Sequence, residues 1–265
     1  MRRSGCGAGA TATGRTRPRT PPTGRRRRPR CTPRSACRRG PRSGWTATAG
    51  SSAGSDVAAS IDLSRRSTEL APELLGAELV STLGGARVRL RITEVEAYEG
   101  LDDPASHAFR GPTNRNRVMF GPPAHLYVYR HLGLHHCANL VVGPAGTASA
   151  VLLRAGEILD GAETAWQRRN DAGVCRRPVD LARGPARLTV ALGIRAEHDG
   201  IAVSLEDDAA PLRLERTGRV RPADVRTGPR VGVSGAGADP QAYPWRYWLA
   251  GDEHVSAYRI GSPRR

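Results

Sequence analysis

Residues 87–98, R-V-R-L-R-I-T-E-V-E-A-Y, decide the fold. The first half of this stretch alternates as a half-buried strand does, with Val88, Leu90 and Ile92 on one face and arginines on the other. Three apolar side chains in alternate positions predict a row that faces the core. We therefore expect this strand to lie against the core of the domain.

Two carboxylates and a phenol come next in the same stretch. If the alternation continues, Glu94, Glu96 and Tyr98 lie on the core-facing row. A carboxylate there is unfavourable unless it meets a partner or lines a wet pocket. We interpret the end of this strand as the floor of an active site. The alternative is that the strand leaves the core after Ile92 and that both glutamates are solvated.

The residues before this strand supply a partner for it. Residues 67–76, S-T-E-L-A-P-E-L-L-G, have a cap-like start and a glycine stop, which predict a short helix. Residues 77–83 predict a strand, and Gly84-Gly85 predicts a hairpin turn. We expect residues 77–83 and 87–98 to pair with each other.

A second hairpin and a central strand follow. Residues 125–142 predict two strands that meet at Leu132 and Gly133. An apolar side chain at such a tip has no core to enter, so Leu132 either packs on a neighbouring loop or serves as a wedge between base steps. The apolar run 150–155 predicts a central strand, and Arg154 near its end needs a carboxylate or phosphate partner.

Four further elements complete the pattern. Residues 156–169 suit a helix, and the Gly-Pro pair at 184–185 opens another. The run R-V-G-V at 230–233 predicts a short strand that enters a glycine-rich loop. That loop does not match the G-x-G-x-x-G fingerprint of dinucleotide-binding proteins. The run P-W-R-Y-W-L-A at 244–250 predicts an aromatic-rich strand that closes the domain.

The N-terminal segment differs in composition from the rest. Residues 2–55 contain no Leu, Ile, Val, Phe, Asp or Glu, and residues 1–55 hold 14 of the 41 arginines, which provide most of the net charge of +16. Such a segment cannot bury enough apolar area to offset its ordering entropy. We predict a disordered Arg-rich tail over residues 1–58 and one folded domain over residues 59–265. The alternatives for the tail are a misassigned translation start and a tether that neutralises phosphates.

Several classes of protein are disfavoured. No apolar run approaches a membrane span or a signal-peptide core. Five cysteines without a C-x-x-C pair argue against a zinc ribbon or a disulfide framework. His135 and His136 are adjacent on a predicted strand, so they point to opposite faces and cannot both reach one ion. We expect no metal, no cofactor and no membrane partner.

Basic side chains gather in two parts of the predicted domain. The long polar loop after Tyr98 carries Arg110, Arg115 and Arg117, which either grip phosphates or are solvated. Residues 213–230 contain six arginines, the last of which is Arg230. We treat Arg230 and the three loop arginines as candidates for contacts with a nucleic-acid backbone.

Six motifs recur in a fixed order between Leu70 and Tyr258: E-V-E-A-Y-E-G-x-x-D-x-A-S-H, N-R-N-R-V-M-F-G-P, Y-V-Y, V-L-L-R-A, G-P-A-R-L and R-V-G-V. Together they closely resemble the alkyladenine (3-methyladenine) DNA glycosylase family of base-excision repair. The resemblance implies an α+β fold, a single mixed domain with a curved antiparallel sheet, flanking short helices and a protruding β-hairpin. It also implies an enzyme that flips alkylated or deaminated purines out of double-stranded DNA and hydrolyses the N-glycosidic bond.

The resemblance implies roles for individual residues in the hydrolysis. Glu96 would be the general base that deprotonates the attacking water. Arg154 and the backbone carbonyl of Val231 would complete the water site. These roles are chemically coherent, because alkylation places positive charge on the purine, which makes it a good leaving group and attracts it to electron-rich rings.

A second set of residues would hold the base and the DNA. Tyr98, His107 and Tyr129 would contact and sandwich the flipped base, and Asn139 would face its exocyclic edge. Leu132 would fill the hole that the base leaves in the duplex. Animal members of the family have Tyr at that position, so the resemblance implies a weaker grip on undamaged DNA here.

The chain contains no lysine, since all 41 basic residues are arginine. Glycosylases that also nick the strand usually form a Schiff base through an amine, and here only the N-terminal amine is present. We expect a monofunctional, monomeric enzyme that leaves an abasic site and acts in the bacterial cytoplasm at the nucleoid. The alternatives are a damaged-DNA-binding protein without catalysis and a hydrolase of free nucleosides.

Overall fold

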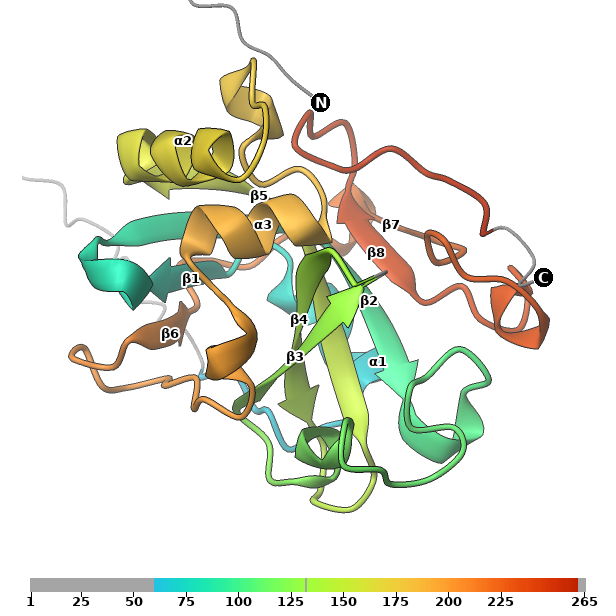
Figure 1. The fold of residues 1–265 in the computed structure, drawn as a ribbon. Coiled ribbons are helices and arrows are strands. Elements are labelled where there is room, and N and C mark those ends of the chain that lie inside the picture. The colour runs from blue at the N-terminus through green and yellow to red at the C-terminus, as the bar shows by residue number, and fades with distance from the viewer. Residues whose placement is uncertain (1–59, 132, 262–265) are drawn as a thin grey trace, which may run out of the picture. The chain divides into compact units, whose positions relative to one another are not determined.

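An eight-stranded sheet organises the described part of the chain (Figure 1). The computed structural model describes residues 60–131 and 133–261. The predicted tail, residues 1–58, and the predicted wedge Leu132 lie outside the described residues, so what we expect of them stays a prediction.

The elements have the following bounds. The strands are β1 (Glu78–Ser81), β2 (Val88–Glu99), β3 (His125–His131), β4 (His135–Val142), β5 (Ser149–Asp160), β6 (Leu212–Glu215), β7 (Val225–Gly228) and β8 (Arg246–Leu249). The α-helices are α1 (Ser67–Leu74), α2 (Ala162–Asp171) and α3 (Pro185–Leu192). Single 3-10 turns are η1 (Leu83–Gly85), η2 (Gly100–Asp102), η3 (Arg117–Phe120), η4 (Pro178–Asp180), η5 (Ala196–His198), η6 (Pro222–Asp224) and η7 (Ala236–Ala238). Over the described ranges, no helix has the length and apolar character needed to cross a membrane.

Strand β2 is the centre of the sheet because it pairs with three other strands. Strand β5 follows it along one side. On the other side β1 pairs with the first half of β2, and β8 pairs with residues 94–96. The order is β3-β4-β5-β2-β1-β6, β7 joins through β8, and every strand pair is antiparallel. The predicted α+β domain with a curved antiparallel sheet is confirmed.

Most elements predicted from the sequence are present. The helix predicted at residues 67–76 is α1, the strand at 77–83 is β1, and η1 turns the chain into β2. Residues 125–142 form the antiparallel hairpin of β3 and β4. The predicted central strand is β5, the Gly-Pro pair at 184–185 opens α3, and the aromatic-rich strand is β8.

The alternation along β2 changes phase within the strand. Ile92 belongs to the main core, but so do Val95 and Ala97, which occupy odd-numbered positions. The pairing of β2 with β5 shifts register between Ile92 and Val95. Such an irregularity bends a strand and re-aims the side chains that follow it. The core-facing row therefore moves from even to odd positions.

This change of phase corrects the prediction for the acidic end of the strand. Glu94, Glu96 and Tyr98 do not continue the core row, as the simple alternation predicts, but face the other side of the sheet. The alternative of solvated glutamates is also wrong, because Glu94 and Glu96 are both 0% exposed. A second layer of the protein must therefore cover this face.

The two faces of the sheet are covered differently. On one face the main core joins the sheet to apolar residues of α1, α2 and α3, and Figure 1 shows α2 and α3 together at one end of the sheet. On the other face the loop of residues 100–123 closes over a smaller cluster that includes Ala108, Met119 and Tyr127. Asn116 fixes this loop, because its buried amide donates hydrogen bonds to the carbonyls of His107 (2.9 Å) and Gly111 (3.1 Å).

Two predicted elements are wrong. Residues 156–169 do not form one helix, since β5 continues to Asp160 and α2 begins at Ala162. Gly156 permits this because its backbone passes close to β2, where an added Cβ would lie 2.4 Å from Leu90 Cδ2. Residues 230–233 do not form a strand either; the strand lies earlier, as β7, and Arg230 is buried.

Gly156→Ala should destabilise the domain by about 1–3 kcal/mol, because the new methyl group must displace Leu90 and the carbonyl oxygen of Arg91, 2.5 Å away. Chemical denaturation measures the free energy of unfolding. Gly218→Ala is the matched control, since nothing lies within 4 Å of its added Cβ. Equal stability of the two variants would refute the close approach of β5 to β2.

Candidate active site

Glu96 lies in a row of residues that crosses four strands. Tyr127 on β3 pairs with Asn139 on β4, Asn139 pairs with Leu152 on β5, and Leu152 pairs with Glu96 on β2. Residues paired in register point to the same face of a sheet. The fold therefore places a carboxylate, an amide and a phenol on one surface, although they are far apart in the sequence.

The carboxylate of Glu96 is held by its neighbours. The hydroxyl of Tyr98 donates to Oε2 at 2.9 Å, and the backbone N–H of Val231 donates to Oε1 at 2.7 Å. Arg154 Nη1 forms an ion pair with Oε1 at 3.3 Å. A carboxylate has about four lone-pair sites, so these contacts orient Glu96 and leave it able to accept a proton from a water molecule.

The partner that the sequence requires for Arg154 is a pair of carboxylates. Arg154 Nε donates to Glu94 Oε1 at 3.0 Å, in addition to its ion pair with Glu96. Arg246 Nε donates to the same oxygen of Glu94 at 2.6 Å, and the backbone N–H of Ser256 donates to the other oxygen at 2.7 Å. The requirement for a charged partner is confirmed, and all four charged side chains of this cluster are buried.

The charged side chains of this cluster keep each other ionised. Burial works to raise the pKa of Glu94, but Arg154 and Arg246 lower it further than burial raises it. Burial works to lower the pKa of Arg154, but the charges of Glu96 and Glu94 raise it above its ordinary value. Arg154 and Glu94 are therefore both ionised at neutral pH.

A pocket of about 310 Å³ opens beside Glu96. The residues that line it are Tyr98, Ala105, His107, Met119, Tyr127, Tyr129 and Asn139. The four residues that the resemblance assigns to base binding are all among them, so the structure brings together the predicted set.

Aromatic rings form most of the wall of this pocket. The ring of His107 stands edge-on to Tyr129, with centroids 4.6 Å apart, and Tyr127 stacks with Tyr129 at 5.7 Å. His107 Nδ1 also lies 3.0 Å from the hydroxyl of Tyr127. Offset and edge-on arrangements of this kind are favourable for aromatic rings. The pocket can therefore accept a flat, apolar ring system.

The phenols around the pocket stay protonated at neutral pH. Burial, followed by the charge of Glu96, raises the pKa of Tyr98 well above its ordinary value. Burial raises the pKa of Tyr127 to about 12, and it also raises that of Tyr129, where Cys137 adds to the effect. Tyr98 is thus a hydrogen-bond donor to Glu96, and the rings are neutral and electron-rich.

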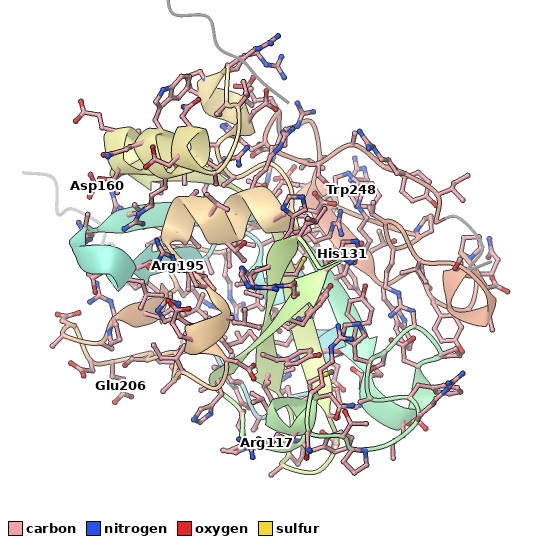
Figure 2. All side chains as sticks on the ribbon, viewed as in Figure 1. Arg117, His131, Asp160, Arg195, Glu206 and Trp248 are labelled. Carbon is pink, nitrogen blue, oxygen red and sulfur yellow. The ribbon has the colours of Figure 1, made fainter. Side chains whose placement is uncertain are left out.

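Three of the four residues predicted to contact the DNA backbone are exposed on the surface. Arg110, Arg115 and Arg117 are exposed on the loop that covers the site. The guanidinium of Arg115 lies 6.0 Å from the ring centroid of Tyr129. Figure 2 labels Arg117 at the start of η3, which packs on β3, and His131 at the other end of that strand. The charges of Arg110, Arg115 and Arg117 are therefore accessible to an anion.

The prediction that Arg230 contacts a nucleic-acid backbone is wrong. The sequence suggests a backbone contact, but the side chain is 0% exposed and forms an ion pair with Asp103. A buried guanidinium that already has a carboxylate partner cannot reach a phosphate on an external ligand. The arginine-rich sequence around Arg230 suggests an exposed side chain, and only the tertiary structure shows that this side chain is buried.

Sequence reasoning missed several residues of the site. Tyr127 lines the pocket with Tyr129, and their shared strand face was the signal that could have identified it. Met119, which also lines the pocket, and Arg246, which binds Glu94, have no comparable signal. At the hairpin, Leu134 is a second apolar side chain beside the turn, and it is 75% exposed.

The described residues contain no group of three His, Cys, Asp or Glu side chains that could hold a metal ion. The predicted role of the Val231 carbonyl stays a prediction, because the contact observed at that residue is made by its N–H.

Comparison with known proteins places the chain in a family. A family model described as methylpurine-DNA glycosylase matches residues 61–253. The chain is 52% identical over 197 residues to a Streptomyces avermitilis protein named "Putative 3-methyladenine DNA glycosylase", a match that covers 74% of this chain and 89% of that protein. A Cutibacterium acnes protein with the same printed name is 49% identical over 203 residues, covering 75% of this chain and 99% of that protein.

Glu94→Gln should destabilise the domain at pH 7 by about 3–5 kcal/mol, because it leaves Arg154 and Arg246 buried without their shared carboxylate. The folded state lowers the pKa of Glu94 from 4.5, so its stabilisation is complete above that pH and disappears as the pH falls through the folded-state pKa. The difference in unfolding free energy between wild type and variant should therefore shrink in acid.

Denaturant titrations at several pH values measure this difference. Glu157→Gln is the control, since Glu157 pairs with Arg91 in a half-exposed position and should contribute about 1 kcal/mol or less. A gap between wild type and Glu94→Gln that did not narrow below pH 4.5 would contradict the ionised state of Glu94.

Proposed function

The chain belongs to the methylpurine-DNA glycosylase family, and we propose from this that it excises damaged purines from duplex DNA with a water molecule activated by Glu96. As a DNA glycosylase it is a hydrolase that acts on N-glycosyl bonds. The observation that carries the finer proposal is the position of Glu96, buried and held by Tyr98 and Val231 beside an aromatic pocket.

In the proposed reaction the damaged nucleotide rotates out of the duplex and its base enters the pocket. Stacking on the tyrosine rings stabilises the flipped base by about 1–3 kcal/mol, which offsets an unstacking cost of a few kcal/mol. A cationic, alkylated purine gains further from the electron-rich rings of Tyr98 and Tyr129. Asn139, which lines the same pocket, faces the edge of the base.

Glu96 then removes a proton from the attacking water as its oxygen bonds to the anomeric carbon. The N-glycosidic bond breaks, and its electron pair goes to the purine, which leaves neutral if it was alkylated and cationic. Arg154 holds Glu96 by its charge, and Glu94 in turn holds Arg154. The products are a free base and an abasic site.

The exposed arginines support a DNA duplex as the partner. Arg110, Arg115 and Arg117 are exposed on the loop of residues 100–123, which contributes residues to the pocket wall, and exposed arginines can neutralise phosphates, a large source of affinity for DNA. Leu132 follows the last residue of β3 in the sequence, and we propose that its side chain is the wedge that replaces the flipped base. We propose that the enzyme acts as a monomer.

Glu96→Gln should abolish release of free base while keeping affinity for a lesion-containing duplex, because the amide keeps an acceptor oxygen but cannot take the proton. The loss should be at least about 100-fold in the single-turnover rate. Duplexes that carry one methylated, deaminated or etheno purine are the substrates, and chromatography of the freed base is the measurement.

Glu99→Gln is the matched control for this experiment. It is the same substitution on the same strand, but Glu99 accepts hydrogen bonds from Ser67 and Arg66 on the α1 side. Undiminished release by Glu96→Gln would rule out its role as the base. Release from free nucleosides as fast as from a duplex would favour a nucleoside hydrolase instead.

The product strand should stay intact after excision, because the sequence contains no lysine to form a Schiff base. Borohydride added during turnover should trap no covalent adduct between protein and DNA, and the strand should break only after treatment with alkali. A lysine-dependent bifunctional glycosylase serves as the positive control for trapping. A trapped adduct would show that the enzyme is not monofunctional.

A further inference from the structure

Arg230 stands out because it is a large side chain that is fully buried beside the site yet does not line the pocket. A guanidinium in the interior is no better for stability than a well-packed apolar side chain of similar volume. What a guanidinium offers instead is fixed geometry. Its planar set of hydrogen-bond donors holds the groups that it binds in defined positions. The question is which groups Arg230 fixes.

The guanidinium of Arg230 joins three separate segments. Nη1 donates to the carbonyl of Ala97 on β2 at 3.0 Å and to Asp103 Oδ2 at 2.5 Å. Nη2 donates to Asp103 Oδ1 at 2.7 Å and to the carbonyl of Gly237 at 3.0 Å. The central strand, the start of the covering loop and the glycine-rich loop after β7 are thus tied to one planar group.

These contacts lie next to Glu96 and Tyr98, the two residues on which the proposed reaction depends. Ala97 lies between Glu96 and Tyr98 in the sequence. The guanidinium carbon of Arg230 is 4.6 Å from the ring centroid of Tyr98, and the next residue, Val231, donates its N–H to Glu96. Arg230 is therefore linked to the carboxylate of Glu96 through the backbone of Val231. It contacts the ring of Tyr98 directly.

The same cluster reaches the wall of the pocket. Asp103 Oδ1 accepts a hydrogen bond from the N–H of Ala105 at 2.9 Å, and Ala105 lines the pocket. A Cβ added to Gly237 would lie 2.7 Å from Ala105 Cβ, so the glycine-rich loop packs directly against this wall. A movement of Arg230 would be transmitted to both sides of the bound base.

We propose that Arg230 is a positioning residue that sets Glu96 and Tyr98 relative to each other, so that the activated water and the stacked base meet in reactive geometry. This inference rests on the proposed function. It replaces the idea that Arg230 contacts the DNA backbone, and the two ideas make opposite predictions about binding.

The test uses Arg230→Lys and Arg230→Gln in the full-length protein. Lysine keeps the charge but presents a single point of contact, so it cannot bind Asp103, Ala97 and Gly237 together. Both variants should lower the single-turnover rate of base release by about 100-fold, the effect of a displacement near 1 Å at a reacting centre. Binding to an undamaged duplex, and its dependence on salt, should equal that of the wild type.

A split between rate and affinity separates positioning from loss of folding. If Arg230 sets Glu96 and Tyr98 relative to each other, the single-turnover rate at saturating lesion-containing duplex should fall, while the duplex concentration that gives half of this rate stays close to that of the wild type. A general loss of folded protein lowers the amount of base released but leaves the rate of each folded molecule unchanged, so it would not produce this split.

Arg216→Gln is the matched control. Arg216 is also nearly buried and pairs with a carboxylate, Glu73, but it follows β6 at the far edge of the sheet. It should leave the rate per folded molecule and the half-saturating duplex concentration unchanged. If both Arg230 variants fail to unfold cooperatively, Asp103→Asn, which keeps one acceptor oxygen, decides by the same fall in the saturating rate.

The outcomes are distinct. Wild-type rates at saturating duplex in folded Arg230 variants would overturn the inference. A salt dependence of duplex binding that falls by about one unit of slope would restore the backbone contact. Failure of the wild type itself to release base would instead overturn the proposed function.

Discussion

The ion pair between Glu94 and Arg154 is the interaction on which the site depends. Two arginines are buried beneath the pocket, and a buried charge without a partner is strongly destabilising. Glu94 neutralises both, because it accepts from Arg154 and Arg246 and from the backbone of Ser256. Glu96 is thereby spared most of this task. It keeps a charged neighbour at 3.3 Å, and because a carboxylate has about four lone-pair sites, Glu96 can accept a further hydrogen bond.

The arginines of this protein divide into two groups that the sequence cannot separate. Arg154, Arg230 and Arg246 are buried and paired with carboxylates, and they shape the site from within. Arg115 and Arg117 are exposed, and Arg115 lies 6.0 Å from the ring centroid of Tyr129 in the pocket wall. All carry the same side chain, so only their tertiary neighbours distinguish a structural role from a binding role. This is why the sequence placed Arg230 in the wrong group.

Local pattern predicted most of the fold, and tertiary pairing explains its failures. Glycine turns and apolar alternation located β1, β2 and the β3–β4 hairpin, because these signals act over a few residues. The phase of β2 was mispredicted, since the shift after Ile92 arises from its pairing with β5, about 60 positions away. For the site, motif resemblance identified four of the pocket residues, Tyr98, His107, Tyr129 and Asn139, and strand parity alone would have found only the tyrosines of β3.

The same register shift constrains how such a protein can diversify. Because β2 serves the apolar core with one set of residues and the reactive pocket with the other, gaining or losing one residue in it would exchange the two sets. We therefore expect insertions and deletions to be tolerated in segments between the strands, such as the covering loop of residues 100–123, and β2 to tolerate substitution only.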